Sequence, residues 1–316
     1  MRRVALIYNP ASGQHSKRHR TAIDKALAVL HGAGVQAEAL RTDAPGSAGT
    51  LAEEAMRRGC DTILACGGDG TVHEVLQSMV GTTVALGVVP LGTANALAAN
   101  LGLRSSPDKA VRQLLTAVPE RASVGHISYR DSTGAPHSRY FTVAAGVGAD
   151  ALFLSRLDPG LKRRFGYPLY LVEGFRVWAT YSFPLFDASF VERASSEPRV
   201  EEISQLLAVR IRDFGGVLHN FVPGASLHKG DLRLVAFKTR SRLRYSRFLL
   251  AVMFGRQTFS NGIELLDAVS VECRARNGSS PRVFAEADGE LLGDLPVKIE
   301  IVPDAVTLLI PPHARP

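Results

Sequence analysis

The sequence lacks the features that mark secreted, membrane-spanning and metal-rich proteins. Its 316 residues include only three cysteines, Cys60, Cys66 and Cys273, which are too few and too scattered for a disulfide framework or a zinc site. The longest uninterrupted apolar run, residues 248–254, is far too short to span a bilayer. Low-complexity tracts and internal repeats are also missing, and we expect no signal peptide at the charged N-terminus. These absences favour a globular cytoplasmic protein with reduced thiols.

Acidic residues are outnumbered by basic ones, which points to an anionic partner. The chain has 30 Asp and Glu against 37 Lys and Arg, for a net charge of +7. Residues 238–256 hold six basic and no acidic residues among apolar side chains, and Lys162–Arg164 forms a second cluster. Such mixtures suit an anionic membrane surface, although a solvated basic face is the simpler interpretation of either cluster alone. The chain shows no nucleic-acid-binding module, so we rank a nucleic-acid partner last.

The first third of the chain alternates short apolar strands with amphipathic helices. We expect strands over residues 4–8, 35–40, 62–65 and 85–89, and helices over 17–30, 47–58, 95–100 and 108–116, with a further helix after residue 71. This alternation predicts an α/β domain with a doubly wound parallel sheet, over residues 1–122. Ligands of such sheets bind beyond the carboxyl ends of the strands.

The remainder of the chain has a different pattern and predicts a mainly antiparallel β-sandwich domain over residues 123–303. The expected helices are 163–180 and 243–254, and the expected strands are 124–129, 140–145, 185–191, 206–211, 232–237, 264–273, 283–285 and 297–301. The last apolar run, 306–310, either completes this domain or returns to the first one, in which case 304–316 belongs to the α/β domain.

Residues 64–76 form the most informative segment, because an apolar strand runs into three glycines within four residues and then into a helix. Glycine lets the backbone approach a ligand closely, and the N–H groups and dipole of the helix favour a bound phosphate. The segment is not a dinucleotide fingerprint, because His73 stands where a third glycine is needed, and it lacks the lysine of a Walker A loop. A plain glycine-rich turn is the alternative.

The string Gly67-Gly68-Asp69-Gly70-Thr71 resembles the signature of a kinase superfamily that includes diacylglycerol, sphingosine and NAD kinases and phosphofructokinases. Three more strings occur at Asn9–Gly13, Pro90–Ala98 and Glu286–Glu290. In this order and spacing the four strings are similar to the diacylglycerol kinase catalytic-domain family, with compact bacterial lipid kinases as the nearest likeness. The resemblance spans nearly the whole chain, and its specificity comes from the combination.

The resemblance implies a role for each matching residue. Asp288 would be the general base that removes the proton from the lipid hydroxyl. ATP would be the cofactor together with Mg²⁺, whose waters Asp69 could bind, and the metal ligands are otherwise unassigned. The residues that would bind the nucleotide are Asn9, Pro10, Ser12, Gly13, Thr42, Gly67, Gly68, Asp69, Gly70, Thr71, Glu74, Gly92, Thr93, Asn95 and Glu290.

Several of these residues have a structural alternative. Asp288-Gly289 is also a strong hairpin signal, and Asn9 before a proline suits a turn. Thr42 is the weakest assignment, since it can be only a loop hydroxyl. Glu74 lies in the first turn of a helix, where a carboxylate is favoured regardless of function.

The chain departs from the family pattern at two places. Ala96 stands where many members carry an aspartate of the presumed metal-water network, and other bacterial members share this variant. The turn 227–231 holds a structural magnesium ion in some members, but His228 and Lys229 replace its acidic residues, so we predict no such site here.

We therefore expect an ATP-dependent lipid kinase that phosphorylates a hydroxyl of a membrane lipid, such as diacylglycerol, a sphingoid base or a related glycerolipid. It would be cytoplasmic and peripherally associated with the inner face of the membrane. An NAD kinase-like enzyme with a soluble acceptor and a non-catalytic nucleotide- or lipid-binding regulator are the alternatives. The sequence does not identify the acceptor lipid or the oligomeric state, and a homodimer stays open.

Overall fold

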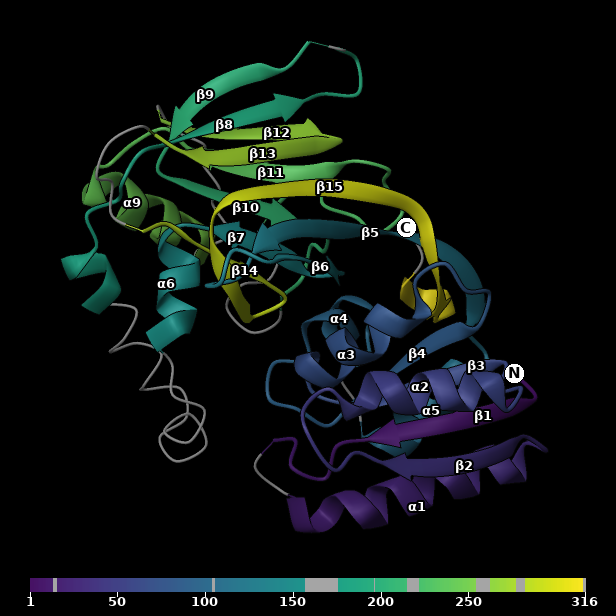
Figure 1. The fold of residues 1–316 in the computed structure, drawn as a ribbon. Coiled ribbons are helices and arrows are strands. Elements are labelled where there is room, and N and C mark those ends of the chain that lie inside the picture. Colours follow the sequence, from purple (N-terminus) through teal and green to yellow (C-terminus); the bar gives the residue numbers. More distant parts are fainter. Residues whose placement is uncertain are drawn as a thin grey trace. The chain divides into compact units, whose positions relative to one another are not determined.

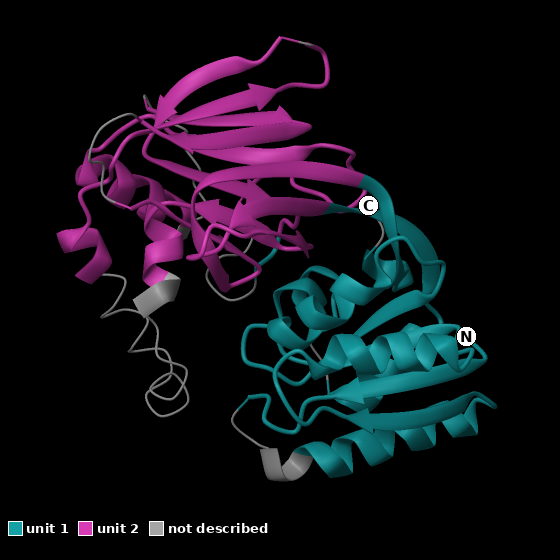
Figure 2. Cartoon of the chain, viewed as in Figure 1, with its two compact units in different colours: residues 1–124, 213–215, 303–316 teal, residues 125–212, 216–302 magenta. Residues whose placement is uncertain are grey.

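Figure 1 shows the chain as a computed structural model, which describes residues 1–13, 16–103, 106–156, 176–195, 197–214, 222–253, 262–276 and 282–314. The chain divides into two compact units (Figure 2). Unit 1 comprises residues 1–124, 213–215 and 303–316, and unit 2 comprises residues 125–212 and 216–302. The basic cluster Lys162–Arg164 and most of the helix expected over 163–180 lie outside the described residues, although residues 176–180 are helical.

Unit 1 is built on a parallel sheet with the strand order β4-β3-β1-β2. Its strands are β1 (Arg3–Tyr8), β2 (Gln36–Arg41), β3 (Thr62–Gly67) and β4 (Ala85–Pro90). Its helices are α1 (Ser16–Gly32), α2 (Ser47–Arg57), α3 (Asp69–Met79), α4 (Ala96–Asn100) and α5 (Pro107–Leu115).

The sequence of unit 1 explains this arrangement. Every residue of β3 is buried, which requires the continuous apolar run expected of a parallel strand covered on both faces. Helix α2 buries Ala48, Ala52 and Ala55, which lie on one face of a 3.6-residue period. The helices pack as two pairs, α1 with α5 and α2 with α3, as in a doubly wound sheet.

Two long strands, β5 (Val118–Arg130) and β15 (Glu290–Ile310), contribute residues to both units. Near its end, β15 pairs in parallel with β4, where Thr307 lies opposite Ala85. The C-terminal apolar run, 306–310, thus belongs to unit 1 in the structure.

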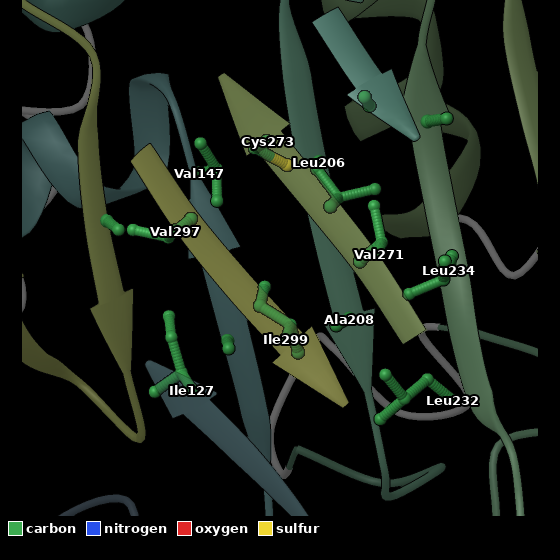
Figure 3. Packing of buried hydrophobic residues seen from close by; sticks show 14 of the residues in the cluster. Ile127, Val147, Leu206, Ala208, Leu232, Leu234, Val271, Cys273, Val297 and Ile299 are labelled. Carbon is green, nitrogen blue, oxygen red and sulfur yellow. The ribbon is translucent and has the colours of Figure 1, made fainter. Parts of the chain in front are cut away.

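Unit 2 is largely antiparallel. Its strands are β6 (Pro136–Phe141), β7 (Ala144–Val147), β8 (Phe186–Val191), β9 (Arg199–Ile203), β10 (Gln205–Val209), β11 (Leu232–Phe237), β12 (Ile263–Ala268), β13 (Ser270–Ala275) and β14 (Phe284–Ala287). Its described helices include α6 (Ala149–Arg156) and α9 (Arg242–Met253), besides the helical residues 176–180. Apolar side chains from these strands form one buried core, which Figure 3 shows at Val147, Leu206, Leu234, Val271 and Ile299.

Several strands of unit 2 differ from the sequence expectation. The run 264–273 is two strands, because the chain changes partners at Val269: β12 pairs with β11, whereas β13 pairs with β8 and β15. The run 140–145 is interrupted between β6 and β7. The sequence analysis missed β9, which pairs with β8 and has three charged residues among its five, as well as α6.

Among the described residues, no helix has both the length and the apolar character needed to cross a membrane.

Candidate functional site

Loops that follow three parallel strands of unit 1 meet at one edge of its sheet. The N–H of Asn9, which follows β1, donates to the carbonyl oxygen of Cys66 on β3 at 3.1 Å. After β4, the N–H groups of Leu91 and Gly92 donate to the carbonyl oxygen of Gly67 at 2.9 and 3.2 Å. The carboxyl ends of parallel strands lie at the same edge of a sheet, so these bonds bring together the loops expected to bind the nucleotide.

Glycine is required where these loops touch. A Cβ atom on Gly92 would lie 2.5 Å from the Cα of Gly68, and one on Gly13 would lie 2.6 Å from the carbonyl oxygen of Leu91. Gly13 also has a φ of +62°, which disfavours other residues. At Gly67 a Cβ atom would overlap the side chain of Thr71, which is buried. The loops are therefore packed backbone against backbone at this edge, which only glycine allows.

Helix α3 begins directly at this junction. Gly68 is its N-cap, with extended backbone, and the N–H groups of Thr71 and Val72 donate to the Gly68 carbonyl oxygen at 3.1 and 3.2 Å. The first N–H groups of a helix have no partner within the helix, and they make its N-terminus a favourable place for an anion. Gly70 is exposed here, so solvent or a ligand can reach this turn.

Asp69 and Asn95 fix the loops to one another. Asp69 Oδ1 accepts the N–H of Ala96 at 2.7 Å, at the start of α4. Asn95 has a φ of 50°, its Oδ1 accepts the N–H of Gly92 at 2.9 Å, and its Nδ2 donates to the Gly92 carbonyl oxygen at 2.7 Å. Thr93, between them, is exposed. The loop between β4 and α4 is thus held rigidly against the glycine junction.

The remaining predicted residues of unit 1 have mostly structural contacts. Asn9 Oδ1 accepts the N–H of Ala11 across Pro10 at 2.8 Å, and Ser12 is buried behind this turn. Thr42 is also buried, just after β2.

Glu74 has a structural contact as well. Its Oε2 accepts the N–H of Ala48 at 3.1 Å, so this carboxylate caps the first turn of α2.

Asp288 and Glu290 belong to unit 2, where a hairpin joins β14 and β15. Asp288 has a φ of 48°, and its carboxylate receives three backbone N–H groups. Oδ1 accepts those of Val143 and Ala144 at 2.9 and 3.1 Å, and Oδ2 accepts that of Thr142 at 3.0 Å. The link between β6 and β7 thereby orients the Asp288 carboxylate. Glu290 begins β15.

A buried pair of carboxyl groups lies next to this hairpin and was not singled out from the sequence. Burial raises the pKa of Asp150, on α6, to about 7. Burial and the neighbouring Asp150 raise the pKa of Glu286, on β14, well above its usual range. The only local mark of this pair in the sequence is Gly146. A Cβ atom at this position would overlap Asp150 Oδ2 and lie 3.0 Å from Glu286 Oε1, so the pair requires glycine here.

The turn 227–231 is filled by a guanidinium group. Arg210 is fully buried, and its Nη2 donates to the carbonyl oxygens of Leu227 and Lys229 at 3.2 and 2.9 Å, while its Nη1 donates to that of Asp231. Burial lowers the pKa of Arg210 to about 10, so the group is still charged at neutral pH. Among the described residues, no cluster of three or more His, Cys, Asp or Glu side chains could hold a metal ion.

Helix α9 divides the main basic cluster into a buried and an exposed face. Tyr245, Phe248 and Val252 are buried. On the opposite face, Leu243 and Leu250 are 68% and 51% exposed, and Leu249, Arg244 and Arg247 are exposed beside them. Exposed leucines among arginines, with no acidic residue on the helix, are unusual for a surface in contact with water alone.

The chain thus combines a glycine-lined edge of a parallel sheet, beside a helix N-terminus, with a separate and largely antiparallel unit. Residues 3–127 match the family described as diacylglycerol kinase catalytic domain, and residues 142–310 match the family described as YegS C-terminal NAD kinase beta sandwich-like domain. The chain belongs to the diacylglycerol kinase catalytic-domain family and carries the YegS-type C-terminal domain. The prediction of a lipid kinase family, and that of an α/β unit followed by a largely antiparallel β unit, are confirmed.

Individual relatives are distant but similar along their whole length. A diacylglycerol kinase of Bacillus subtilis is 26% identical over 300 residues, which cover 94% of this chain and 92% of the relative. A diacylglycerol kinase of Mycobacterium tuberculosis is 27% identical over 316 residues, covering 98% and 96%. The crystal structure of a diacylglycerol kinase from Bacillus anthracis str. Sterne has the same fold, with a TM-score of 0.71 at 19% identity over 99% of this chain and 98% of that one.

Proposed function

We propose that this chain is an ATP-dependent kinase that transfers the γ-phosphate to a hydroxyl group of a membrane lipid. The observation that carries the proposal is the convergence of the loops after β1, β3 and β4, where Gly13 and Gly92 leave no room for a Cβ atom. A backbone surface of this kind, next to the N-terminus of α3, suits a triphosphate. Residues 1–122, completed by 304–316, would be the nucleotide-binding domain, and residues 123–303 the lipid-binding domain.

Within the nucleotide site, Gly68 and Gly70 would cradle the phosphates with their N–H groups, and Gly67 and Thr71 would shape the turn that carries them. Asp69 is the carboxylate nearest this cradle, and Mg²⁺ bound to a nucleotide commonly uses one or two carboxylates together with phosphate oxygens and water. The residue types present therefore fit a magnesium ion carried by ATP, which would neutralise charge that develops during transfer.

The other residues of the site would shape it. Asn9, Pro10, Ser12, Thr42, Thr93 and Asn95 would line the cleft, and Glu290 would contact the nucleotide from unit 2. For Glu74 we favour a purely structural role, because its carboxylate already caps α2.

For the chemical step, Asp288 would accept the proton of the lipid hydroxyl as the oxygen attacks the γ-phosphorus. Three backbone N–H groups hold its carboxylate in one orientation, which is the pre-organisation that a base needs. Diacylglycerol, a sphingoid base or another glycerolipid is the acceptor that we propose.

The exposed face of α9 would bring the enzyme to its substrate. Leu243 and Leu250 would enter the headgroup region, and Arg244 and Arg247 would pair with anionic lipids. The protein would thus work in the cytoplasm, at the inner face of the membrane.

The proposal is tested by comparing two glycine variants. In Gly92→Ala the new methyl group would collide with the Gly68 backbone, so we expect the Kd for ATP to rise at least tenfold. Gly32→Ala is the matched control, since a Cβ there meets nothing within 4 Å and the Kd should not change. Equal ATP affinity in both variants would remove the nucleotide site from this edge.

The acceptor is identified by incubating the wild type with labelled ATP, magnesium and a panel of lipids in mixed micelles, and with NAD. Label in one lipid would establish the kinase and its substrate. Label in NAD alone would favour the NAD kinase-like alternative. ATP binding without transfer to any acceptor would favour a non-catalytic regulator.

A further inference from the structure

The buried carboxyl groups of Asp150 and Glu286 face one another beside the hairpin that carries Asp288. Helix α6 packs against β14 and β7, and Gly146 on β7 leaves the space that the two carboxyl groups occupy. Both carboxyl groups lie within a few ångströms of the position that a Cβ atom at residue 146 would take. Any larger residue at this position would therefore separate them.

Within the described ranges, neither group lies beside a cation that would balance its charge. No Lys, Arg or His in the described ranges forms an ion pair with Asp150 or Glu286. The carboxylate oxygens of Asp150 are buried, and no described residue forms a well-aligned hydrogen bond with them. The nearby backbone N–H groups of residues 150 and 151 partly offset this by favouring the charged form of Asp150. Two adjacent carboxylates without a cation cannot both stay ionised at low cost in a buried site.

Among the residues that the structure describes, the groups that interact with the pair carry no positive charge. Tyr181 is 7% exposed and Tyr245 is buried, with its hydroxyl 2.9 Å from Ser204 Oγ, and both interact electrostatically with Asp150. Asp288 interacts with Glu286 in the same way and raises its pKa further. The titratable groups that interact with the pair in the described part of the chain are thus acids, which makes retention of a proton by the pair more favourable.

We propose that Asp150 and Glu286 share a single proton, and that this singly charged pair positions the hairpin that carries Asp288. Glu286 Oε2 accepts the N–H of Gly289 at 2.9 Å, so the pair is attached directly to the residue after Asp288. Loss of the shared proton would leave two carboxylates that repel each other, and α6 would move away from β14. The claim that the pair positions Asp288 for catalysis rests on the proposed function, whereas the claim of a shared proton does not.

The shared proton predicts how stability depends on pH. The folded pair keeps a proton that the unfolded chain releases near pH 4, so the contribution of the pair to stability falls as pH rises from about 4 towards neutrality and then levels off. For one proton the unfolding equilibrium constant rises by up to about tenfold per pH unit over this range. The alkaline limb of kcat/KM should report the same group.

The test uses Asp150→Asn and Glu286→Gln, which keep the shape but remove the second acid, with Glu197→Gln on the exposed surface as control. We expect the Tm of each amide variant, compared with that of the wild type and of the control at the same pH, to rise between about pH 4.5 and pH 7. We also expect the amide variants to flatten the alkaline limb of kcat/KM. Two amide variants are used so that failure of one to fold does not decide the result.

Each contrary outcome has a clear meaning. If the Tm of both amide variants changes with pH as the Tm of the wild type does, the proposal of a shared proton is refuted. A Tm that Mg²⁺ raises in the wild type but not in Asp150→Asn would also overturn it, because the pair would then be a doubly ionised cation site. Flattened stability slopes with an unchanged pH–rate profile would overturn the positioning role. A wild type that phosphorylates no acceptor would refute the proposed function. The pH dependence of Tm in the wild type and the amide variants would still show whether the pair shares a proton.

Discussion

Replacement of Asp288 by Asn is the sharpest test of the catalytic assignment, because the structure predicts two separable effects. The carboxylate accepts three backbone N–H groups, two on Oδ1 and one on Oδ2. An asparagine has one oxygen and one NH₂ group. In its best orientation its oxygen still accepts the N–H groups of Val143 and Ala144, but its NH₂ group then faces the N–H of Thr142, and neither donor has an acceptor. The loss of one such bond, with its donor unsatisfied, costs about 1–3 kcal/mol.

That cost is too small to abolish folding. A domain with a stability of about 5–15 kcal/mol would remain more than nine-tenths folded after losing about 3 kcal/mol. We expect the Tm of Asp288→Asn to fall by several degrees and its Kd for ATP to stay near the wild-type value. Loss of the general base, by contrast, should lower kcat by about 10²–10⁴-fold. Unfolding of a tenth of the protein cannot account for such a loss.

The assay measures kcat in mixed micelles, ATP affinity and thermal unfolding on the same preparations, with Glu197→Gln as a surface control. A kcat within about tenfold of the wild type would refute Asp288 as the base, because removal of a general base costs more than that. A parallel fall in kcat, ATP affinity and Tm would refute it in another way, by showing that the hairpin is needed for the fold rather than for proton transfer.

Two further predictions concern unit 2. The double variant Leu243→Gln, Leu250→Gln should bind anionic vesicles at least tenfold more weakly than the wild type, because each leucine contributes about 1.5–3 kcal/mol when fully buried. The control Leu291→Gln, at an exposed leucine outside α9, should bind as the wild type does. Equal binding of the double variant and the wild type in a vesicle sedimentation assay would rule out this face of α9. Arg210→Met should lower the free energy of unfolding by about 3 kcal/mol or more, because three carbonyl groups lose a buried donor. EDTA should leave the denaturation curve of the wild type unchanged. A wild-type Tm that falls with EDTA would mean that a metal ion also supports this turn.

The turn 227–231 illustrates how far sequence reasoning can reach. His228 and Lys229 indicated that this turn departs from the family pattern, and that departure was visible from the residues of the turn alone. The guanidinium group that binds the carbonyl oxygens of the turn was not visible, because Arg210 lies on the preceding part of the chain and reaches the turn only through tertiary packing.

Glu74 and Asp150 illustrate the same limit in opposite directions. Glu74 stands beside the glycine junction in sequence, yet its carboxylate points to α2 because helices α2 and α3 pack together. Asp150 was not singled out, because nothing local marks it apart from Gly146, four residues earlier. Its partner Glu286 is far away in the chain, so their interaction depends on how α6 packs against β14.

The sequence by itself determined the period of the strands and helices in unit 1, the glycine junction between β3 and α3, and the family. These features are local or follow from motif order, and a parallel sheet places the ends of its strands at one edge whatever its details. The tertiary structure decided where the C-terminal run pairs, where the strands of unit 2 change partners, and which buried charges face one another. Those choices depend on contacts between residues far apart in the chain, whose free energy no local pattern records.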